Sequence, residues 1–321
     1  MSLFIASLNS GSNGNCYYVG NATEAVLIDA GISCREIDKR MKRLCLDARK
    51  IKAIFISHEH TDHIKGAETL AKNLRIPVYI TPRTLRHSRL TFDSGIIRSF
   101  QPDVPITIGN LSVSAFSKFH DAADPHSFVV YNENVRVGVF TDIGAVCPNV
   151  IRYFKTCDAV FLESNYDDEM LEQGPYPYHL KRRIKGGRGH ISNTEAYKLF
   201  VEHRPPYMSH LLLSHLSHQN NDPVLVENLF SNANGNVNIA VASRFQESPI
   251  YEITRERGNS AMVGMKIGAT INLKPILNKK KVTSTIHEHQ LSLFSRAHIC
   301  YDVFNSLNHS HKTRRNTTLK I

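Results

Sequence analysis

Four residues with metal-binding side chains lie close together in the segment SHEHTDHIKG, at His58, His60, Asp62 and His63. Residues two apart in an extended chain point the same way, so His58 and His60 can converge on one ion. The chain then turns, and Asp62 and His63 can face a second ion nearby. Imidazole nitrogens and carboxylate oxygens suit Zn²⁺, Mn²⁺ or Fe. The alternative is a polar turn in which Asp62 caps a helix. It explains only one of the four residues, so we favour a metal site.

Strand ends are where we expect the remaining ligands, because two ions need more than this motif supplies. The apolar run KAIFIS (52–57) predicts a buried strand that ends directly before the motif. His120 follows LSVSAFSKF, Asp142 follows VRVGVFT and His215 follows SHLLLS. Loops at strand ends can present all three to one cleft. A carboxylate has two oxygens, so Asp142 could bridge both ions.

The wider pattern consists of strand-rich stretches followed by alternating helices and strands. Short β-prone runs fill 3–28 and 96–141, and three further strands are expected at DAVFLES, SHLLLS and VNIAVA. Helical spacing and capping residues predict helices at 33–46, 64–73, 145–155, 178–185, 192–203 and 223–231. This order predicts sheets with helices on their outer faces.

The basic charge of the chain is concentrated near its end. The net charge is +10, yet residues 259–321 hold ten Lys and Arg against two acids. We therefore expect a nearly neutral domain over 1–257 and a basic, weakly ordered tail over 258–321. A hydrophobic share of 41% excludes a wholly disordered protein.

The six cysteines are far apart and form no C-x-x-C pair, which excludes a disulfide framework and a thiolate zinc site. No stretch approaches the ~20 apolar residues that a membrane span needs. The start of the chain has too short an apolar run for a secretory signal. We expect a cytoplasmic protein.

These residues and their order resemble the metallo-β-lactamase-fold hydrolases. The resemblance implies an α/β (α+β) fold, a four-layer αββα sandwich of two mixed sheets flanked by helices. It implies two divalent metal ions (Zn²⁺, Mn²⁺ or Fe). One would take His58, His60 and His120, the other Asp62, His63 and His215, and Asp142 would bridge them. Asp29, at the end of AVLID, is similar to the family's first aspartate and is expected behind the ligands.

Longer segments resemble the YycJ/WalJ branch of this fold, whose members are exonuclease-like. They are SGSNGNCYYV, FHDAADP, FTDIG, ESNYD, GPYPYHLKRRIKGGRGHISN and LSHLSHQNND. The resemblance implies a phosphodiesterase acting on DNA, a 5′→3′ exonuclease with a metal-bridging hydroxide as nucleophile. The candidate catalytic residues are Asp62, Glu163 and His190. Glu163 and His190 resemble an accessory pair of ribonuclease Z, in which Glu163 would orient His190 to protonate the leaving oxygen.

Two features of the sequence favour phosphate binding. Five cations closely precede His190, and we expect them to attract substrate phosphates: Lys181, Arg182, Arg183, Lys185 and Arg188. The loop SGSNGN (10–15) offers small residues whose backbone N–H groups could form an anion-binding nest. A solvated helix face and an ordinary glycine-rich turn are the alternatives.

Two other functions remain open. The first is a metal-dependent hydrolase of a small thioester, lactone or lactam, because a metal pair does not choose among these substrates. The second is a non-catalytic adaptor that binds DNA or the sliding clamp. QLSLF, with Gln290, Leu291, Leu293 and Phe294, resembles the peptide with which bacterial replication and repair proteins bind the clamp.

Overall fold

The computed structural model describes residues 1–93, 95–233 and 235–255. The expected tail and its QLSLF segment, with Gln290, Leu291, Leu293 and Phe294, lie outside the described residues. The division of the chain at 257/258 and the clamp interaction therefore stay predictions. No helix in the described part of the chain is long and apolar enough to cross a membrane.

The first sheet combines antiparallel strands from the start of the chain with parallel ones that follow. Its order is β14 (Tyr251–Ile253), β1 (Leu3–Asn9), β2 (Cys16–Gly20), β3 (Ala25–Ile28), β4 (Ile51–Phe55), β5 (Val78–Tyr79) and β6 (Ile97–Arg98). Pairing is antiparallel from β14 to β3 and parallel from β3 to β6. β1, β2, β3 and β4 are almost wholly buried, as their apolar sequences predict.

The second sheet has the same mixed design. Its order is β13 (Asn238–Val241), β12 (His210–Ser214), β11 (Ala159–Glu163), β10 (Arg136–Phe140), β9 (His126–Tyr131), β8 (Leu111–Ser117) and β7 (Ile106–Ile108). Strands β7 to β10 pair antiparallel, and β10 to β13 pair parallel. The carboxyl ends of its parallel strands therefore lie at one edge of the sheet.

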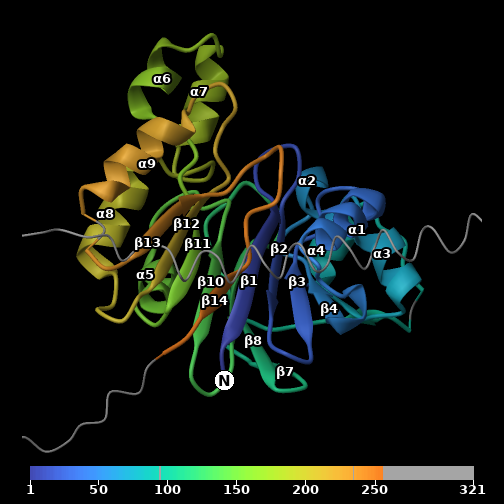
Figure 1. Cartoon of the computed structure of the whole chain (residues 1–321). Coiled ribbons are helices and arrows are strands. Elements are labelled where there is room, and N and C mark those ends of the chain that lie inside the picture. Colours follow the sequence, from blue (N-terminus) through green and yellow to red (C-terminus); the bar gives the residue numbers. More distant parts are fainter. Residues whose placement is uncertain (94, 234, 256–321) are drawn as a thin grey trace, which may run out of the picture. The chain divides into compact units, whose positions relative to one another are not determined.

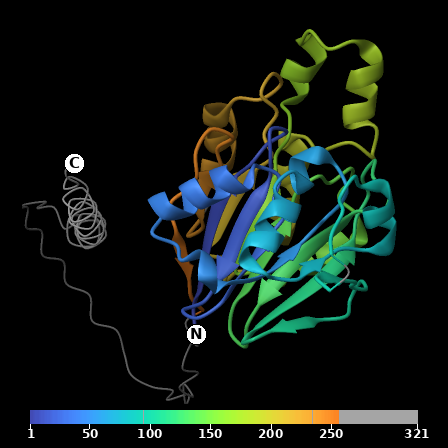
Figure 2. The same cartoon turned by 90° about the vertical axis from the view of Figure 1, so that its right-hand side faces the viewer.

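Helices cover the outer face of each sheet, which gives the predicted four layers (Figure 1, Figure 2). The first sheet carries α1 (Cys34–Arg43), α3 (Ala67–Leu74) and α4 (Pro82–His87), and the second carries α5 (Pro148–Phe154), α8 (Asn193–His203) and α9 (Pro223–Ser231). Three buried clusters fill the spaces between the layers. In the central one, Tyr17 packs on Phe161 with ring centroids 4.9 Å apart, which joins β2 to β11 across the sandwich.

The structure differs from the predicted helices in two places. The expected helix over 64–73 is two helices, α2 (Thr61–Ile64) and α3, interrupted at Gly66. A Cβ at Gly66 would lie 2.2 Å from the Ile32 carbonyl oxygen, and its N–H donates to Ala30. This close approach explains the break. The helix α6 (Asp168–Gln173) was not predicted, and it lies with α7 (Tyr178–Lys185) beyond the sheets (Figure 1).

Candidate metal centre

All seven predicted metal ligands lie at one edge of the sandwich. The first four follow β4, and His60 directly precedes α2, whose first turn contains Asp62. The remaining three follow strands of the second sheet: His120 after β8, Asp142 after β10 and His215 after β12. Each sheet thus supplies part of the donor set, as the strand-end prediction required.

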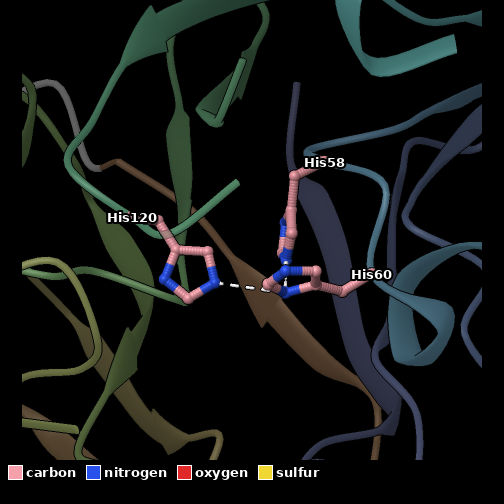
Figure 3. A group of neighbouring side chains, drawn as sticks. All are labelled: His58, His60 and His120. Atoms are coloured by element: carbon pink, nitrogen blue, oxygen red, sulfur yellow. Dashed lines mark hydrogen bonds between the residues drawn. The ribbon is translucent and has the colours of Figure 1, made fainter. Parts of the chain in front are cut away.

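Three histidines converge on one point (Figure 3). His60 Nδ1 lies 3.1 Å from His58 Nε2 and 3.4 Å from His120 Nε2. In a tetrahedral zinc site with Zn–N bonds of 2.0–2.1 Å, ligand nitrogens are about 3.3 Å apart. Both distances from His60 match this spacing, and the three residues form one of the groups able to hold a metal.

The other nitrogens of these rings are held by the protein. His58 Nδ1 lies 2.9 Å from the Ser57 hydroxyl, and His120 Nδ1 lies 2.9 Å from the Gly189 carbonyl oxygen. Such partners fix the tautomer and orientation of a ligand histidine. Burial lowers the pKa of His58 well below its usual range and that of His120 to about 4. Both rings are thus neutral, which is the form that binds a metal.

A second donor group lies beside the first. His63 Nε2 and His215 Nε2 are 3.4 Å and 3.6 Å from Asp62 Oδ2. Asp142 lies between the two groups: its Oδ2 is 3.2 Å from His63 Nε2, and its Oδ1 is 3.8 Å from His120 Nε2. This position matches the predicted bridging carboxylate.

The donor set fits a divalent cation. Among the described residues, Asp142 Oδ2 and His215 Nε2 are buried atoms without a hydrogen-bond partner. Burial lowers the pKa of His215, but Asp142, Asp62 and Glu163 outweigh it and raise the pKa to about 10. The buried carboxylates therefore demand positive charge, which a divalent cation would supply.

Asp29 lies behind the ligands, as expected. Its Oδ2 is 2.7 Å from His63 Nδ1, and its two oxygens accept from the Ser57 N–H and hydroxyl, each at 2.8 Å. Asp29 thus holds His63 directly and His58 through Ser57. Our sequence reasoning missed Ser57, although its place as the first polar residue after an apolar strand was a usable signal.

Three site residues occupy the left-handed backbone region. The φ angles of Asp29, Asp142 and His215 are 60°, 54° and 57°. Residues other than glycine seldom adopt this conformation, and it costs about 1–3 kcal/mol at a functional site. Each of these residues comes just after a strand, so the turn redirects its side chain toward the shared centre.

The predicted pair Glu163 and His190 is in contact. Glu163 Oε1 lies 2.8 Å from His190 Nδ1 and 3.2 Å from His215 Nδ1. Its Oε2 accepts from the N–H groups of Ile143 and Ile191. Burial raises the pKa of Glu163, but the charge of His190 and the hydrogen bonds with His190 and His215 lower it to about 2. An ionised Glu163 therefore orients both rings.

A groove of about 1010 Å³ opens onto the ligands. Of the predicted basic cluster, Arg183 lines it, and its Nε donates to Asp121 at 2.5 Å. Lys181 and Lys185 instead bind the Glu172 carbonyl and carboxylate on α6, and Arg182 lies over the Tyr178 ring. The exposed Arg188 stands apart from these contacts. Phosphate binding by the five cations stays a prediction, with Arg183 the member that lines the groove in the structure described.

The loop 10–15 positions ligands, which was not our prediction. The N–H groups of Gly11, Gly14 and Asn15 donate within the protein, to Asn15 Oδ1, Gly11 and Asp62 respectively. These three N–H groups are thus engaged within the protein, and anion binding by the loop stays a prediction. Instead, Asn15 Nδ2 lies 3.2 Å from Asp62 Oδ2, so the loop steadies that carboxylate.

Lys118 is a further site residue that our sequence analysis did not single out. It is buried below the centre, where its Nζ donates to the Thr141 carbonyl beside Asp142. Burial lowers its pKa, opposed by Asp142, Asp29 and Glu163. A lysine at a strand end is usually exposed, so the sequence carried no signal for it.

An αββα sandwich with a histidine- and aspartate-rich centre at one sheet edge defines the chain as a metallohydrolase-type protein. A sequence model described as β-lactamase superfamily domain matches residues 24–215. The chain is 34% identical to "Exodeoxyribonuclease YycJ" of Bacillus anthracis over 232 residues, 69% of this chain and 85% of the relative. It is 29% identical to "Exodeoxyribonuclease WalJ" of Streptococcus pneumoniae over 219 residues, 67% and 81% of the two chains.

Solved structures agree on the fold. The metallo-β-lactamase fold protein YhfI from Bacillus subtilis superposes with a TM-score of 0.61 at 17% identity, over 78% of this chain and all of that chain. The chain therefore belongs to the β-lactamase superfamily, with the metallo-β-lactamase fold and a YycJ/WalJ-like sequence. The predicted family, branch and fold class are confirmed.

Proposed function

We propose that the chain is a binuclear metal-dependent phosphodiesterase that acts on DNA as a 5′→3′ exonuclease. The coarser statement, a metal-dependent hydrolase, follows from its family and from its histidine and aspartate groups. The observation that carries the finer proposal is the pair of donor groups on either side of Asp142, both open to one long groove. The names of the YycJ and WalJ relatives support DNA as the substrate.

Two divalent ions would divide the ligands along the lines of the structure. His58, His60 and His120 would hold one, Asp62, His63 and His215 would hold the other, and Asp142 would contact both. Imidazole and carboxylate ligands suit Zn²⁺ or Mn²⁺. When bound, such ions lower the pKa of water and neutralise charge on a phosphodiester.

The chain's own residues complete the reaction. His190 lines the groove, and Glu163 holds its Nδ1, so Nε2 is the nitrogen left to give a proton to the leaving oxygen. His190 must carry this proton before the bond breaks, and the Glu163 carboxylate stabilises its imidazolium form. Asp62, steadied by Asn15, keeps its place among the ligands during the displacement.

The test is degradation of labelled DNA by the purified protein. Oligonucleotides labelled at the 5′ or the 3′ end, made of DNA or RNA, are incubated with Mn²⁺, Zn²⁺ or EDTA. We expect DNA cleavage that requires metal, and loss of at least 1000-fold in kcat for His58→Ala and Asp142→Ala, because each removes a ligand. Undiminished cleavage by both variants would refute the proposal, and cleavage of a thioester or lactone instead would favour the small-molecule alternative.

A further inference from the structure

The groove extends well beyond the metal ligands. It is also lined by Lys65 and Thr69, at the end of α2 and on α3, and by His87 and Arg89, at and just beyond the end of α4. These residues belong to the helices of the first sheet and the turns that follow them. None of its residues is part of the donor groups described above.

The ionic contacts along the groove leave two cations free. Asp121 is paired with Arg183, and Glu59 accepts from the Ala123 N–H at 2.7 Å. Asp62 and Asp142 face the donor histidines, and the Glu68 carboxylate, which also lines the groove, accepts from the Thr91 N–H at 3.4 Å. Among the lysines and arginines of the described groove lining, Lys65 and Arg89 are the ones that make no ion pair.

Both cations stand on fixed backbone. Lys65 is the C-cap of α2, three residues after Asp62, and its N–H donates to the Thr61 carbonyl. Arg89 lies between Ser88, whose hydroxyl donates to Leu85, and Leu90, whose N–H donates to Ser88 Oγ. The backbone at both positions is held by hydrogen bonds and both side chains are exposed, so their charges can reach a ligand in the groove.

We propose that Lys65 and Arg89 form a phosphate subsite, which binds the nucleotide phosphates next to the one being cleaved. The inference rests on the proposed function and names which part of the substrate this side of the groove holds. Arg89 offers a planar pair of donors and Lys65 a point charge, both suited to phosphate oxygens.

A subsite of this kind distinguishes a chain of nucleotides from a single phosphodiester. Bis(p-nitrophenyl) phosphate has one phosphodiester and reaches the metal centre alone, whereas a 20-nucleotide single strand also places phosphates at Lys65 and Arg89. Because the subsite does not touch the reacting atoms, its loss should raise KM for the oligonucleotide and leave kcat nearly unchanged.

The experiment compares Lys65→Ala and Arg89→Ala with the matched controls Lys72→Ala and Arg86→Ala. The two control residues are exposed on α3 and α4 and do not line the groove. We expect each subsite variant to raise KM for the oligonucleotide about three- to tenfold, with no change for bis(p-nitrophenyl) phosphate. The controls should behave as the wild type with both substrates.

A binding measurement without catalysis completes the test. Anisotropy of a fluorescein-labelled single strand is followed in EDTA at increasing salt. The double variant should reduce the slope of log K against log salt by about 1.4, since single strands release about 0.7 counterions per phosphate contact. An unchanged slope, or a rise in KM that the controls share, would overturn the subsite. If the wild type cleaves neither substrate, the proposed function fails, and the slope still decides whether these residues contact phosphate.

Discussion

Four histidine rings of this centre, those of His58, His63, His120 and His215, each have Nδ1 held by the protein and Nε2 directed at the other donors. Asp29 makes this arrangement for His63 and, through Ser57, supports His58. The chemistry of the site thus depends on residues that would never touch a metal. A substitution at Asp29 can test this without disturbing the ligands themselves.

Asp29→Asn should weaken metal binding while the fold remains intact. Asparagine has the same shape and tolerates the φ of 60°, but it lacks the charge that orients His63 and favours its metal-binding tautomer. We expect metal affinity to fall about 10- to 100-fold, measured by competition with a fluorescent chelator. The control is Asp38→Asn. Asp38 lies on α1, where it pairs with Lys42 on the surface. Equal affinities for both variants would contradict the prediction.

The sequence singled out residues that the structure brings together, and it missed several of the residues around them. Residue type and spacing identified the four candidates of the first motif, His58, His60, Asp62 and His63. The later candidates were identified by their position after apolar strands. Lys118 and the contacts of Asn15 depend on loops from distant parts of the chain meeting in space. The sequence did not predict that Glu172, on the unpredicted helix α6, binds Lys181 and Lys185 of the basic cluster.

At the scale of elements, three loops pack tightly to form the centre. The Asn15 N–H donates to the Asp62 carbonyl, the Gly31 N–H to Asn15, and the Ala30 N–H to His63. A Cβ at Gly31 would lie 1.6 Å from the Asp62 carbonyl oxygen. The loop after β3 can approach α2 this closely because residue 31 has no side chain.

Gly31→Ala should therefore displace Asp62 and damage the centre. We expect the free energy of unfolding to fall by about 2–4 kcal/mol, in the range of overpacked or strained sites. Metal content after purification should fall with it. Urea unfolding followed by circular dichroism and elemental analysis measure the two effects. Gly95→Ala is the matched control, because a Cβ there meets nothing within 4 Å. Normal metal content in Gly31→Ala would show that the loop adjusts.

The far end of the sandwich has its own link between the sheets. Glu24, in the turn before β3, accepts from the Asn110 N–H at 2.6 Å in the turn between β7 and β8, and from Asn21 and Thr23. Burial raises the pKa of Glu24, but these hydrogen bonds outweigh it and lower the pKa below its usual value. The ionised carboxylate thus stabilises the fold.

Glu24→Gln should cost about 1–2 kcal/mol at neutral pH, because a charge-assisted acceptor is lost. A lowered folded pKa means that this stabilisation is present above the unfolded pKa of about 4.3 and disappears as the pH falls through the folded value. The gap between wild type and variant should therefore shrink from pH 6 to pH 3 in urea titrations. Glu252→Gln, at an exposed position of β14, serves as the control. A constant gap would contradict the assignment.

For the whole molecule, the metal centre lies where two sheets meet, one built from β1 to β6 and β14 and the other from β7 to β13. The loop after β4 supplies four ligands, and the ends of β8, β10 and β12 supply three. A cation bound there contacts both sheets only when they are packed together, so it binds the folded chain and not the unfolded one. Metal binding must then add to the free energy of unfolding.

Zn²⁺ or Mn²⁺ should accordingly raise the melting temperature of the EDTA-treated protein. At 100 times the dissociation constant the gain is about 2.7 kcal/mol, or about 5–10 °C for a domain of this size. Far-UV circular dichroism is the measurement of choice, since the chain has no tryptophan. His58→Ala should lose most of this shift because it removes a ligand from one sheet, and Asp142→Asn should do the same from the other. The exposed His179→Ala should keep the shift. If added metal left the melting temperature of the wild type unchanged, the centre would not hold the sheets together.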